Sequence, residues 1–257
     1  VLGAAQKRSR AMKPSVVATL GAIVFAVLLA AYLFAYATTV RDPVEWKSGD
    51  LIVQDSKVAD VLPLFGGDGS GITHIGIVDV RDGRAVVIEA AEKVVETPVY
   101  TYLGRGKDKA YSIYRLTALN EKQREAVAAA ARRQLGKPND YFLRRSWDQL
   151  YSSELVRLAY SDIGFDLGRL QRLGKAGGDM TKVRSQFSRK WEANVDCQKR
   201  RFDSEQCWAM MIKQEVVTPA SIVADAHMTK IFEVKAPTNA ITLTSMTGKK
   251  TEPGAAP

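Results

Sequence analysis

The stretch "THIGIVDVRDGRAVVIEAA", residues 73–91, decides the fold that this sequence predicts. It contains two runs rich in β-branched residues, 73–80 and 85–91, and such runs are typical of β-strands. The Asp82-Gly83 pair between them is a strong signal for a tight hairpin turn. We therefore expect the two runs to be antiparallel neighbours in a sheet.

Other segments extend this sheet and cover it with helices. The further predicted strands are "GDLIVQ" (49–54), "VVETPVYTYL" (94–103), "AYSIYRL" (110–116) and "KIFEVK" (230–235). The predicted helices are 119–138, capped by Asn120 and ended by Gly136 and Pro138, then 146–164, and the proline-started 217–226. The glycine-rich run 66–71 should be a loop, and it lacks the Lys-Ser/Thr of a phosphate-binding loop. The pattern indicates an α+β domain with a small, mostly antiparallel sheet of five or six strands.

The N-terminal part of the chain resembles a membrane anchor. Residues 15–37, "SVVATLGAIVFAVLLAAYLFAYA", carry no charge and exceed the ~20 residues that span a bilayer core. Four basic residues lie in 1–14, which predicts a cytoplasmic N-terminus and an extracytoplasmic or periplasmic soluble domain behind a single-pass anchor in the inner membrane. A cleaved signal peptide is the alternative, because "AYA" at 35–37 resembles a cleavage site, although the apolar core is about twice the usual length.

The predicted organisation is therefore a basic cytoplasmic segment (1–14), a transmembrane helix (15–38), a linker (39–48), one globular domain (49–235) and a disordered tail (236–257). A length of 257 residues with 46% hydrophobic content suits one sizeable core. The true start of the chain is left open, since position 1 is Val and residues before Met12 can be an extension.

Positive charge is concentrated in residues 168–213. This segment holds 11 Lys and Arg against 5 Asp and Glu, which is +6 of the overall +9. Outside a membrane such a segment can attract anionic lipid or polymer, while the extracytoplasmic location argues against a nucleic-acid partner. A solvated surface without a partner is the plainer interpretation. The two cysteines of the chain, Cys197 and Cys207, lie here and are expected to form a disulfide; two free thiols are the alternative, and the pair offers too few ligands for zinc.

Two histidines occur in the chain, and one lies where chemistry is plausible. His74 begins the first run of the hairpin, directly after the glycine-rich loop, whereas His227 lies near a helix end. Glu89 is in the second run, where a carboxylate is costly to bury unless it is paired. We expect Glu89 to accept a hydrogen bond from one ring nitrogen of His74 and to leave the other nitrogen as a base. The alternatives are a structural histidine and an outward, solvated glutamate.

A nucleophile for this base is sought in "DQLYSSELVRLAY", residues 148–160. Ser152 lies in the predicted helix 146–164, and peptide dipoles near a helix N-terminus stabilise a developing negative charge. The "GxSxG" motif of many serine hydrolases is missing, and a serine within a helix is most often only a tolerated small residue.

Taken in order, several motifs resemble one family. The chain is similar to the YiiX/YebB-like permuted papain-fold amidases of the NlpC superfamily over 49–234, through "GDLIVQ", "THIGIV", "VVIEAA", "GKPNDYF", "DQLYSSELV" and "VVTPASI". The resemblance implies a circularly permuted papain-like domain in which His74 is the base, Glu89 orients it and Ser152 stands at the position of the nucleophilic cysteine. Backbone N–H groups near Ser152, helped by Tyr151, would hold the oxyanion. No metal or organic cofactor is implied.

The serine at position 152 leaves three interpretations open: an engineered, inactivating exchange of a native cysteine, a natural serine hydrolase, or a natural protein that binds without turnover. The family chemistry would be attack on an amide or ester carbonyl, with a peptidoglycan peptide, a lipoprotein or a lipid as substrate. A protein of the envelope that docks a partner through its basic segment is a third class of function. A thiol of pKa ~8.5 is driven to thiolate beside an imidazolium, whereas a serine hydroxyl needs base assistance during attack.

Overall fold

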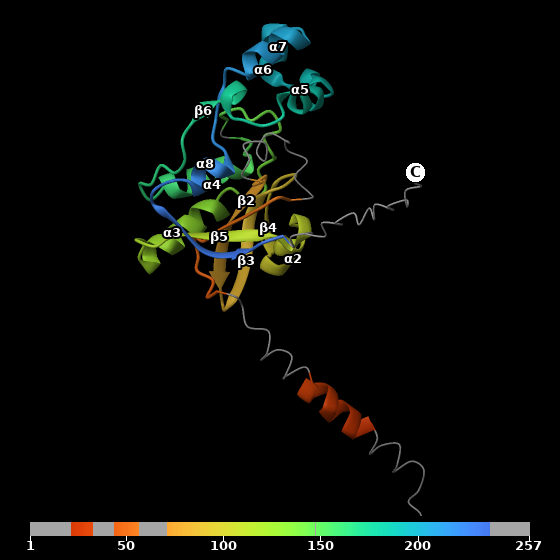
Figure 1. Ribbon diagram of the computed structural model, residues 1–257, viewed down its shortest axis with the longest axis vertical. Helices are drawn as coiled ribbons and strands as arrows, with labels where there is room; N and C mark the ends of the chain where they lie inside the picture. Colours follow the sequence, from red (N-terminus) through yellow and green to blue (C-terminus); the bar gives the residue numbers. More distant parts are fainter. Residues whose placement is uncertain (1–21, 33–43, 57–70, 147, 237–257) are drawn as a thin grey trace, which may run out of the picture. The chain divides into compact units, whose positions relative to one another are not determined.

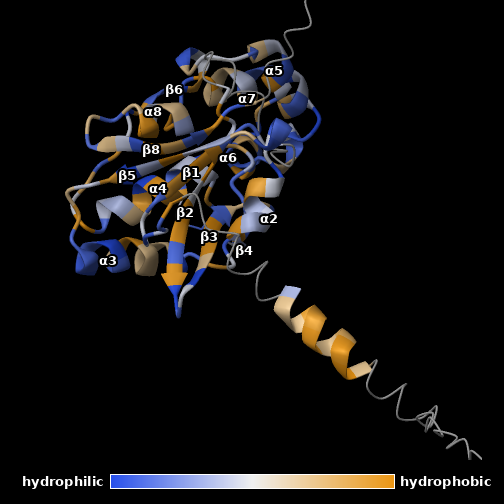
Figure 2. Ribbon diagram, turned by 60° about the horizontal axis from the view of Figure 1, so that its bottom comes forward, coloured by the Kyte–Doolittle hydropathy of each residue, from blue (hydrophilic) through white to orange (hydrophobic). Residues whose placement is uncertain are grey.

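The computed structural model describes residues 22–32, 44–56, 71–146 and 148–236. The chain divides into two compact units, 1–45 and 46–257. In the first unit, residues 22–32 form a helix with exposed apolar side chains, and Figure 2 shows it in the hydrophobic colour. Among the described residues no helix is both long and apolar enough to cross a membrane. Residues 15–21 and 33–38 of the predicted anchor, the 66–70 part of the glycine run and the tail from 237 lie outside the described residues, so these expectations stay predictions.

The second unit is built on an antiparallel sheet with the strand order β4-β3-β2-β1-β5-β8 (Figure 1). Its strands are β1 (Leu51–Gln54), β2 (His74–Arg81), β3 (Arg84–Ala90), β4 (Val94–Pro98), β5 (Tyr111–Leu116) and β8 (Met228–Val234). The hairpin predicted at 73–91 is confirmed: Arg81 pairs with Arg84 across a turn in which Asp82 and Gly83 have φ of 50° and 72°. The predicted α+β architecture is confirmed as well, and the sheet has six strands where five or six were expected.

The predicted strand 94–103 is wrong over its second half. The chain leaves β4 at Pro98 and forms the helix α2 (Val99–Gly104), followed by a 3-10 turn at Lys107–Lys109. Pro98, which has no N–H to give to a strand ladder, is the N-cap of α2. Val99, Tyr102 and Leu103 are the buried residues of this helix, and their spacing of three and four is helical rather than alternating.

Two helices pack together and cover the sheet at β2. The helix α3 (Glu121–Arg132) begins, as predicted, at a capping box formed by Asn120 and Gln123. The helix α4 (Ser152–Ser161) packs against α3, β2, β3 and the short α8 (Pro219–Val223), which the sequence also predicted. α4 starts six residues later than the prediction of 146–164. Before it the chain is held in a non-helical course, in which the Leu150 N–H donates to the Pro138 carbonyl at 3.0 Å.

Residues 168–216 form a lobe of short elements, which we name the basic lobe. It consists of β6 (Gln171–Arg172) paired with β7 (Glu215–Val216), 3-10 turns at Leu173–Lys175 and Trp191–Ala193, and the helices α5 (Met180–Ser188), α6 (Val195–Arg200) and α7 (Ser204–Met211). Figure 1 shows α5, α6 and α7 gathered together. The predicted disulfide is confirmed: Cys197 in α6 and Cys207 in α7 are bonded, with their Cα atoms 5.4 Å apart. Val183, Phe187 and Met211 are buried too and belong to the same hydrophobic cluster as the two cysteines.

Candidate active site

His74 and Glu89 meet across the central hairpin. His74 is the first residue of β2, and its Nε2 lies 2.7 Å from Oε2 of Glu89 in β3. The β2–β3 register pairs Ile77 with Ile88, so the two residues are diagonal neighbours on one face of the sheet, which is within reach of long side chains. Both are buried, His74 with 8% and Glu89 with 1% of its surface exposed. The structure therefore brings together the two residues that the sequence proposed as base and orienting acid.

The carboxyl of Glu89 has three donors around it. Oε2 faces His74, while Oε1 accepts a hydrogen bond of 2.5 Å from the Thr97 hydroxyl and pairs with the Arg105 guanidinium. Burial acts to raise the pKa of Glu89, but the hydrogen bond and charge of His74, together with Thr97 and Arg105, outweigh it and lower the pKa below its ordinary value. Glu89 is therefore held as an ionised acceptor, and Nε2 of His74 must carry the proton of their hydrogen bond.

The remaining nitrogen of His74 is then the basic one. Within the described ranges, Nδ1 of His74 makes no hydrogen bond. A histidine whose Nε2–H is fixed by a carboxylate presents Nδ1 with a free lone pair, which is the arrangement of a general base. The side chain of His74 is also held in plane, since its ring stacks on Tyr102 with centroids 5.6 Å apart and planes 27° from parallel.

Tyr102 is itself fixed from β1. Its hydroxyl donates to the Ile52 carbonyl at 3.2 Å, and its own carbonyl accepts from Nε2 of Gln54 at 3.1 Å. The Arg105 guanidinium lies over the Tyr102 ring, 5.4 Å from the ring centre. Thr97, Tyr102 and Arg105 were not singled out from the sequence. The requirement for a partner to a buried Glu89 signals that donors must exist, but nothing in the chain order says which residues they are.

Ser152 is the first residue of α4, with 6% of its surface exposed. Its predecessor Tyr151 is the N-cap residue in an extended conformation, with φ of −93° and ψ of 165°. The first N–H groups of a helix have no intrahelical partner, and they carry the positive end of the helix dipole. The helix α4 packs on β2 and β3, the two strands that carry His74 and Glu89. The sequence had placed Ser152 well inside a longer helix.

Tyr151 and Glu154 fix the start of α4. The Tyr151 hydroxyl accepts a hydrogen bond of 3.1 Å from the Val217 N–H, and burial raises the pKa of Tyr151. The Glu154 carboxyl accepts the N–H of Tyr151, while burial and then the charge of Asp140 raise the pKa of Glu154 to about 8. Burial likewise raises the pKa of Asp140 to about 7, against the charge of Arg144. The predicted contribution of Tyr151 to an oxyanion hole stays a prediction.

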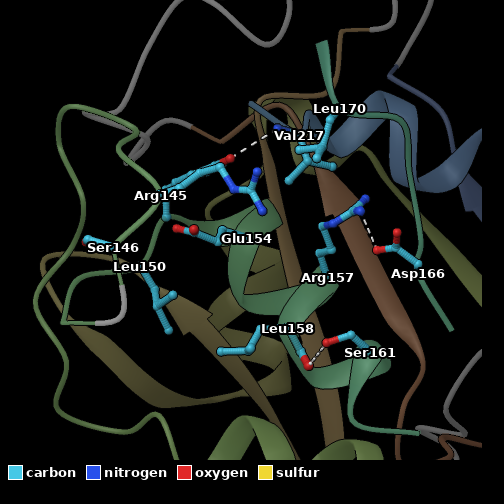
Figure 3. Close-up of a pocket in the computed structure, with 11 residues that line it drawn as sticks. Arg145, Ser146, Leu150, Glu154, Arg157, Leu158, Ser161, Asp166, Leu170 and Val217 are labelled. Carbon is cyan, nitrogen blue, oxygen red and sulfur yellow. Dashed lines mark hydrogen bonds and ion pairs between the residues drawn. The ribbon is translucent and has the colours of Figure 1, made fainter. Parts of the chain in front are cut away.

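A pocket of about 600 Å³ lies along α4, on the side of the helix that faces away from its buried residues (Figure 3). From the helix it is lined by residues three, four and seven positions apart, namely Glu154, Arg157, Leu158 and Ser161. Arg157 is anchored there, because it pairs with Asp166 and donates to the carbonyls of residues 167 and 168. Ser152 and His74 do not line this pocket.

His227 lies on the surface, where its Nδ1 is 2.7 Å from Asp225 and its ring meets Phe165 edge-on. It takes no part in the His74 arrangement. Among the described side chains there is no group of three or more His, Cys, Asp or Glu residues that could hold a metal ion.

The chain is similar to known proteins over most of the second unit. A family model described as "permuted papain-like amidase enzyme, YaeF/YiiX, C92 family" matches residues 45–232. The chain is 26% identical to YiiX of Escherichia coli K12, a protein named as uncharacterised, over 151 residues, which is 58% of this chain and 75% of YiiX. A crystal structure of YiiX from Escherichia coli O157:H7, described as a metalloprotein, superposes with a TM-score of 0.61 at 24% identity, covering 73% of this chain and 97% of that one.

The family match spans β2 and β3, the strands that carry His74 and Glu89, and the helix that begins at Ser152. By this family resemblance the chain is a cysteine amidase-like hydrolase with a permuted papain-like fold, and it belongs to the permuted papain-like amidases of the YaeF/YiiX family.

Proposed function

We propose that this protein is a hydrolase or acyltransferase of the cell envelope. The residue at position 152 would be the nucleophile that attacks an amide or ester of the substrate. The observation that carries the proposal is the His74–Glu89 pair of 2.7 Å on β2 and β3, the strands against which α4 packs. The pair supplies an oriented base, and the helix N-terminus supplies free N–H groups for an oxyanion. Ser152 lies at the first residue of that helix.

In the proposed reaction, Nδ1 of His74 takes the proton from the nucleophile at position 152 as the nucleophile attacks the carbonyl carbon. The oxyanion of the tetrahedral intermediate is stabilised by N–H groups of the first turn of α4. When the intermediate collapses, His74 returns the proton to the leaving nitrogen or oxygen and an acyl-enzyme remains. Water, activated by the same nitrogen, or another acceptor then releases the acyl group. Glu89 stays ionised throughout and stabilises the imidazolium.

We further propose that the form with Ser152 is impaired or inactive, and that cysteine is the residue suited to this position. A thiol can exist as thiolate beside an imidazolium, while a serine hydroxyl with a far higher pKa cannot. The alternative, a natural protein that binds an acyl or peptidyl ligand without turnover, is favoured by the serine itself. Peptidoglycan peptides, lipoproteins and lipids are the proposed substrate or ligand classes.

The test uses Ser152→Cys in the full chain. Both native cysteines are in the disulfide, so the introduced thiol is the only free one in the protein. Its rate of alkylation by iodoacetamide is measured against pH. We expect an apparent thiol pKa at least about one unit below the ordinary ~8.5, and a return toward 8.5 in the Ser152→Cys/His74→Ala protein. Ser153→Cys, one residue along on the same helix and fully buried, is the matched control and should react slowly at every pH.

A profile of the introduced thiol that matches free cysteine and does not depend on His74 would refute the catalytic proposal. Incubating the Ser152→Cys protein with envelope extracts then separates enzyme from binder. A covalent acyl adduct on the introduced thiol, absent after His74→Ala, supports the enzyme. Ligand retained without adduct or hydrolysis supports the binder.

We propose that residues 15–38 anchor the protein in the inner membrane with the N-terminus inside, and that the basic lobe contacts anionic lipid of the same membrane. In support, the 11 cationic side chains of 168–213 are all exposed. Two of them form ion pairs to acidic residues of the same segment, Lys182 to Asp179 and Arg184 to Glu205. Most of the positive charge is thus available to a partner.

A further inference from the structure

We infer that Arg105 and Thr97 are positioning residues of the active site, which fix one oxygen of Glu89 so that the other is presented to His74. The inference rests on the proposed function and names two residues of its machinery beyond the base and its acid. It is carried by the way the donors divide between the two carboxyl oxygens. Neither residue touches the atoms that would react, so each acts through Glu89.

The division of donors is one-sided. Among the described residues, Oε1 of Glu89 accepts from both the Thr97 hydroxyl, at 2.5 Å, and the Arg105 guanidinium, whereas Oε2 accepts from Nε2 of His74 alone. A carboxylate that is free to turn about its last bond offers either oxygen to a donor. With Oε1 held from two sides, rotation breaks two contacts in a buried site. Oε2 therefore stays in the direction of the imidazole.

Arg105 also supplies charge. Glu89 is 1% exposed, and an ionised carboxylate at such a depth requires compensation. When His74 is neutral, it supplies a hydrogen bond to Glu89 but no positive charge. Arg105 is then the cation in contact with Glu89, and it keeps the carboxylate ionised in that state. Loss of Arg105 would let Glu89 take up a proton and stop accepting from His74.

The position of Arg105 is set by the same elements that hold the histidine ring. It is the C-cap residue of α2, where its N–H donates to the Tyr102 carbonyl at 3.1 Å. Its guanidinium lies over the ring of Tyr102, and that ring stacks on His74. Arg105 thus contacts two groups that themselves contact His74, namely the Glu89 carboxylate and the Tyr102 ring. The short helix that replaced the predicted strand is what places it.

Two other buried acids, one directly before β1 and one in β2, show what a purely structural pairing looks like. Asp50 pairs with Arg115 at 2.7 Å, and Asp79 pairs with Arg132 at 2.7 Å. Both acids are fully buried, and the partners that hold them include arginine side chains but no histidine. Glu89 differs because one of its donors is an imidazole whose second nitrogen makes no hydrogen bond to the residues that the structure describes. The pair Asp79–Arg132 is consequently a matched control for stability without an expected role at the site.

The experiment measures the pH profile of iodoacetamide alkylation of the introduced thiol in Ser152→Cys, alone and combined with Arg105→Met, Arg105→Lys, Thr97→Val, Thr97→Ser or Arg132→Met. We expect Arg105→Met and Thr97→Val to slow alkylation near pH 6.5 by about tenfold, which corresponds to about one unit in the apparent thiol pKa. Arg105→Lys and Thr97→Ser, which keep the charge and the hydroxyl, should recover most of the rate. Arg132→Met should lower the melting temperature and leave the profile unchanged.

The outcomes separate this inference from the proposed function. If His74→Ala shifts the profile while folded Arg105→Met and Thr97→Val do not, the positioning role is overturned and the proposed function stands. If His74→Ala leaves the profile of Ser152→Cys unchanged, the proposed function is wrong and the positioning role falls with it. Should Arg105→Met fail to fold, the contrast between Thr97→Val and Thr97→Ser decides whether the donors to Oε1 position Glu89. Thr97→Val removes the hydroxyl at nearly equal side-chain size, whereas Thr97→Ser keeps the hydroxyl.

Discussion

Nε2 of His74 and Oε2 of Glu89 lie 2.7 Å apart on neighbouring strands, and Glu89 is almost completely buried. The pair therefore contributes to the stability of the fold, besides the role in chemistry that we propose for it. Because the folded state lowers the pKa of Glu89, its contribution to stability is fully present above the ordinary pKa of 4.5 and is lost as pH falls through the folded value.

Glu89→Gln should consequently remove part of the acid sensitivity of the protein. We expect the difference in unfolding free energy between the parent and Glu89→Gln to favour the parent at pH 6 and to shrink below about pH 4.5. Urea unfolding at pH 6, 5, 4 and 3 measures it. Equal differences at all four values would contradict the ionised state of Glu89.

Glu154 and Asp140 should act in the opposite direction. Their pKa values are raised to about 8 and about 7, so the folded protein binds protons that the unfolded chain has already released. Stability is then lost as pH rises from about 4, the ordinary range of these acids, to about 8. Glu154→Gln keeps an acceptor for the Tyr151 N–H. The difference in melting temperature between Glu154→Gln and the parent should be more favourable to the variant at pH 8 than at pH 5, by roughly 2–4 °C, which corresponds to about 1 kcal/mol.

The control for this prediction is Glu192→Gln, since Glu192 is exposed in the basic lobe. It should shift the melting temperature equally at both pH values. A melting temperature of Glu154→Gln that differs from the parent by the same amount at pH 5 and pH 8 would show that Glu154 is ionised in the folded state.

Gly76, between His74 and Val78 in β2, has no room for a side chain. An added Cβ would lie 2.4 Å from Cγ1 of Val87 and 3.3 Å from the ring of Tyr102. Val87 is buried and β-branched, so it cannot turn away easily. Gly76→Ala should cost about 1–3 kcal/mol in thermal unfolding. Gly104→Ala is the control, because nothing lies within 4 Å of its added Cβ, and it should be neutral or slightly stabilising.

The disulfide between Cys197 and Cys207 closes a short loop within the basic lobe, ten residues along the chain. Its removal by Cys197→Ser/Cys207→Ser should destabilise the lobe by about 2–3 kcal/mol. Amide hydrogen exchange of α5, α6 and α7 is the measurement, with the strands of the large sheet as internal reference. Faster exchange spread evenly over sheet and lobe would show that the lobe does not unfold as a separate part.

The basic lobe should be protected by anionic lipid. In full-length protein reconstituted into vesicles with 30% phosphatidylglycerol, exchange in 168–213 is expected to slow relative to vesicles of phosphatidylcholine, and 0.5 M NaCl should reverse the effect. Lys199→Gln/Arg200→Gln/Arg201→Gln should weaken the protection, at about 1 kcal/mol per charge. Lys107→Gln/Lys109→Gln/Lys122→Gln, with the same charge change outside the lobe, should not. Equal protection in both vesicle types would identify the lobe as a solvated surface.

Local signals in the sequence sufficed for several features. The Asp82-Gly83 turn, the capping of α3 by Asn120 and the proline start of α8 each depend on residues within a few positions of one another. The same holds for the close cysteine pair. The identity of His74 and Glu89 as partners followed from the hairpin, because a tight turn fixes the register of the two strands that flank it.

The tertiary structure decided what depends on distant contacts. The sequence pattern predicts one helix over 146–164, yet residues 148–151 are not helical, the Leu150 N–H donates to the Pro138 carbonyl, and α4 begins at Ser152. Residues 99–103 suit a strand by composition, but burial of Val99, Tyr102 and Leu103 on one side favours the helix α2, whose C-cap is Arg105. The sequence by itself determined the hairpin and the residue types of the site. Packing between separate segments determined which donors surround Glu89, because a buried carboxylate is satisfied by whatever groups the fold brings to it.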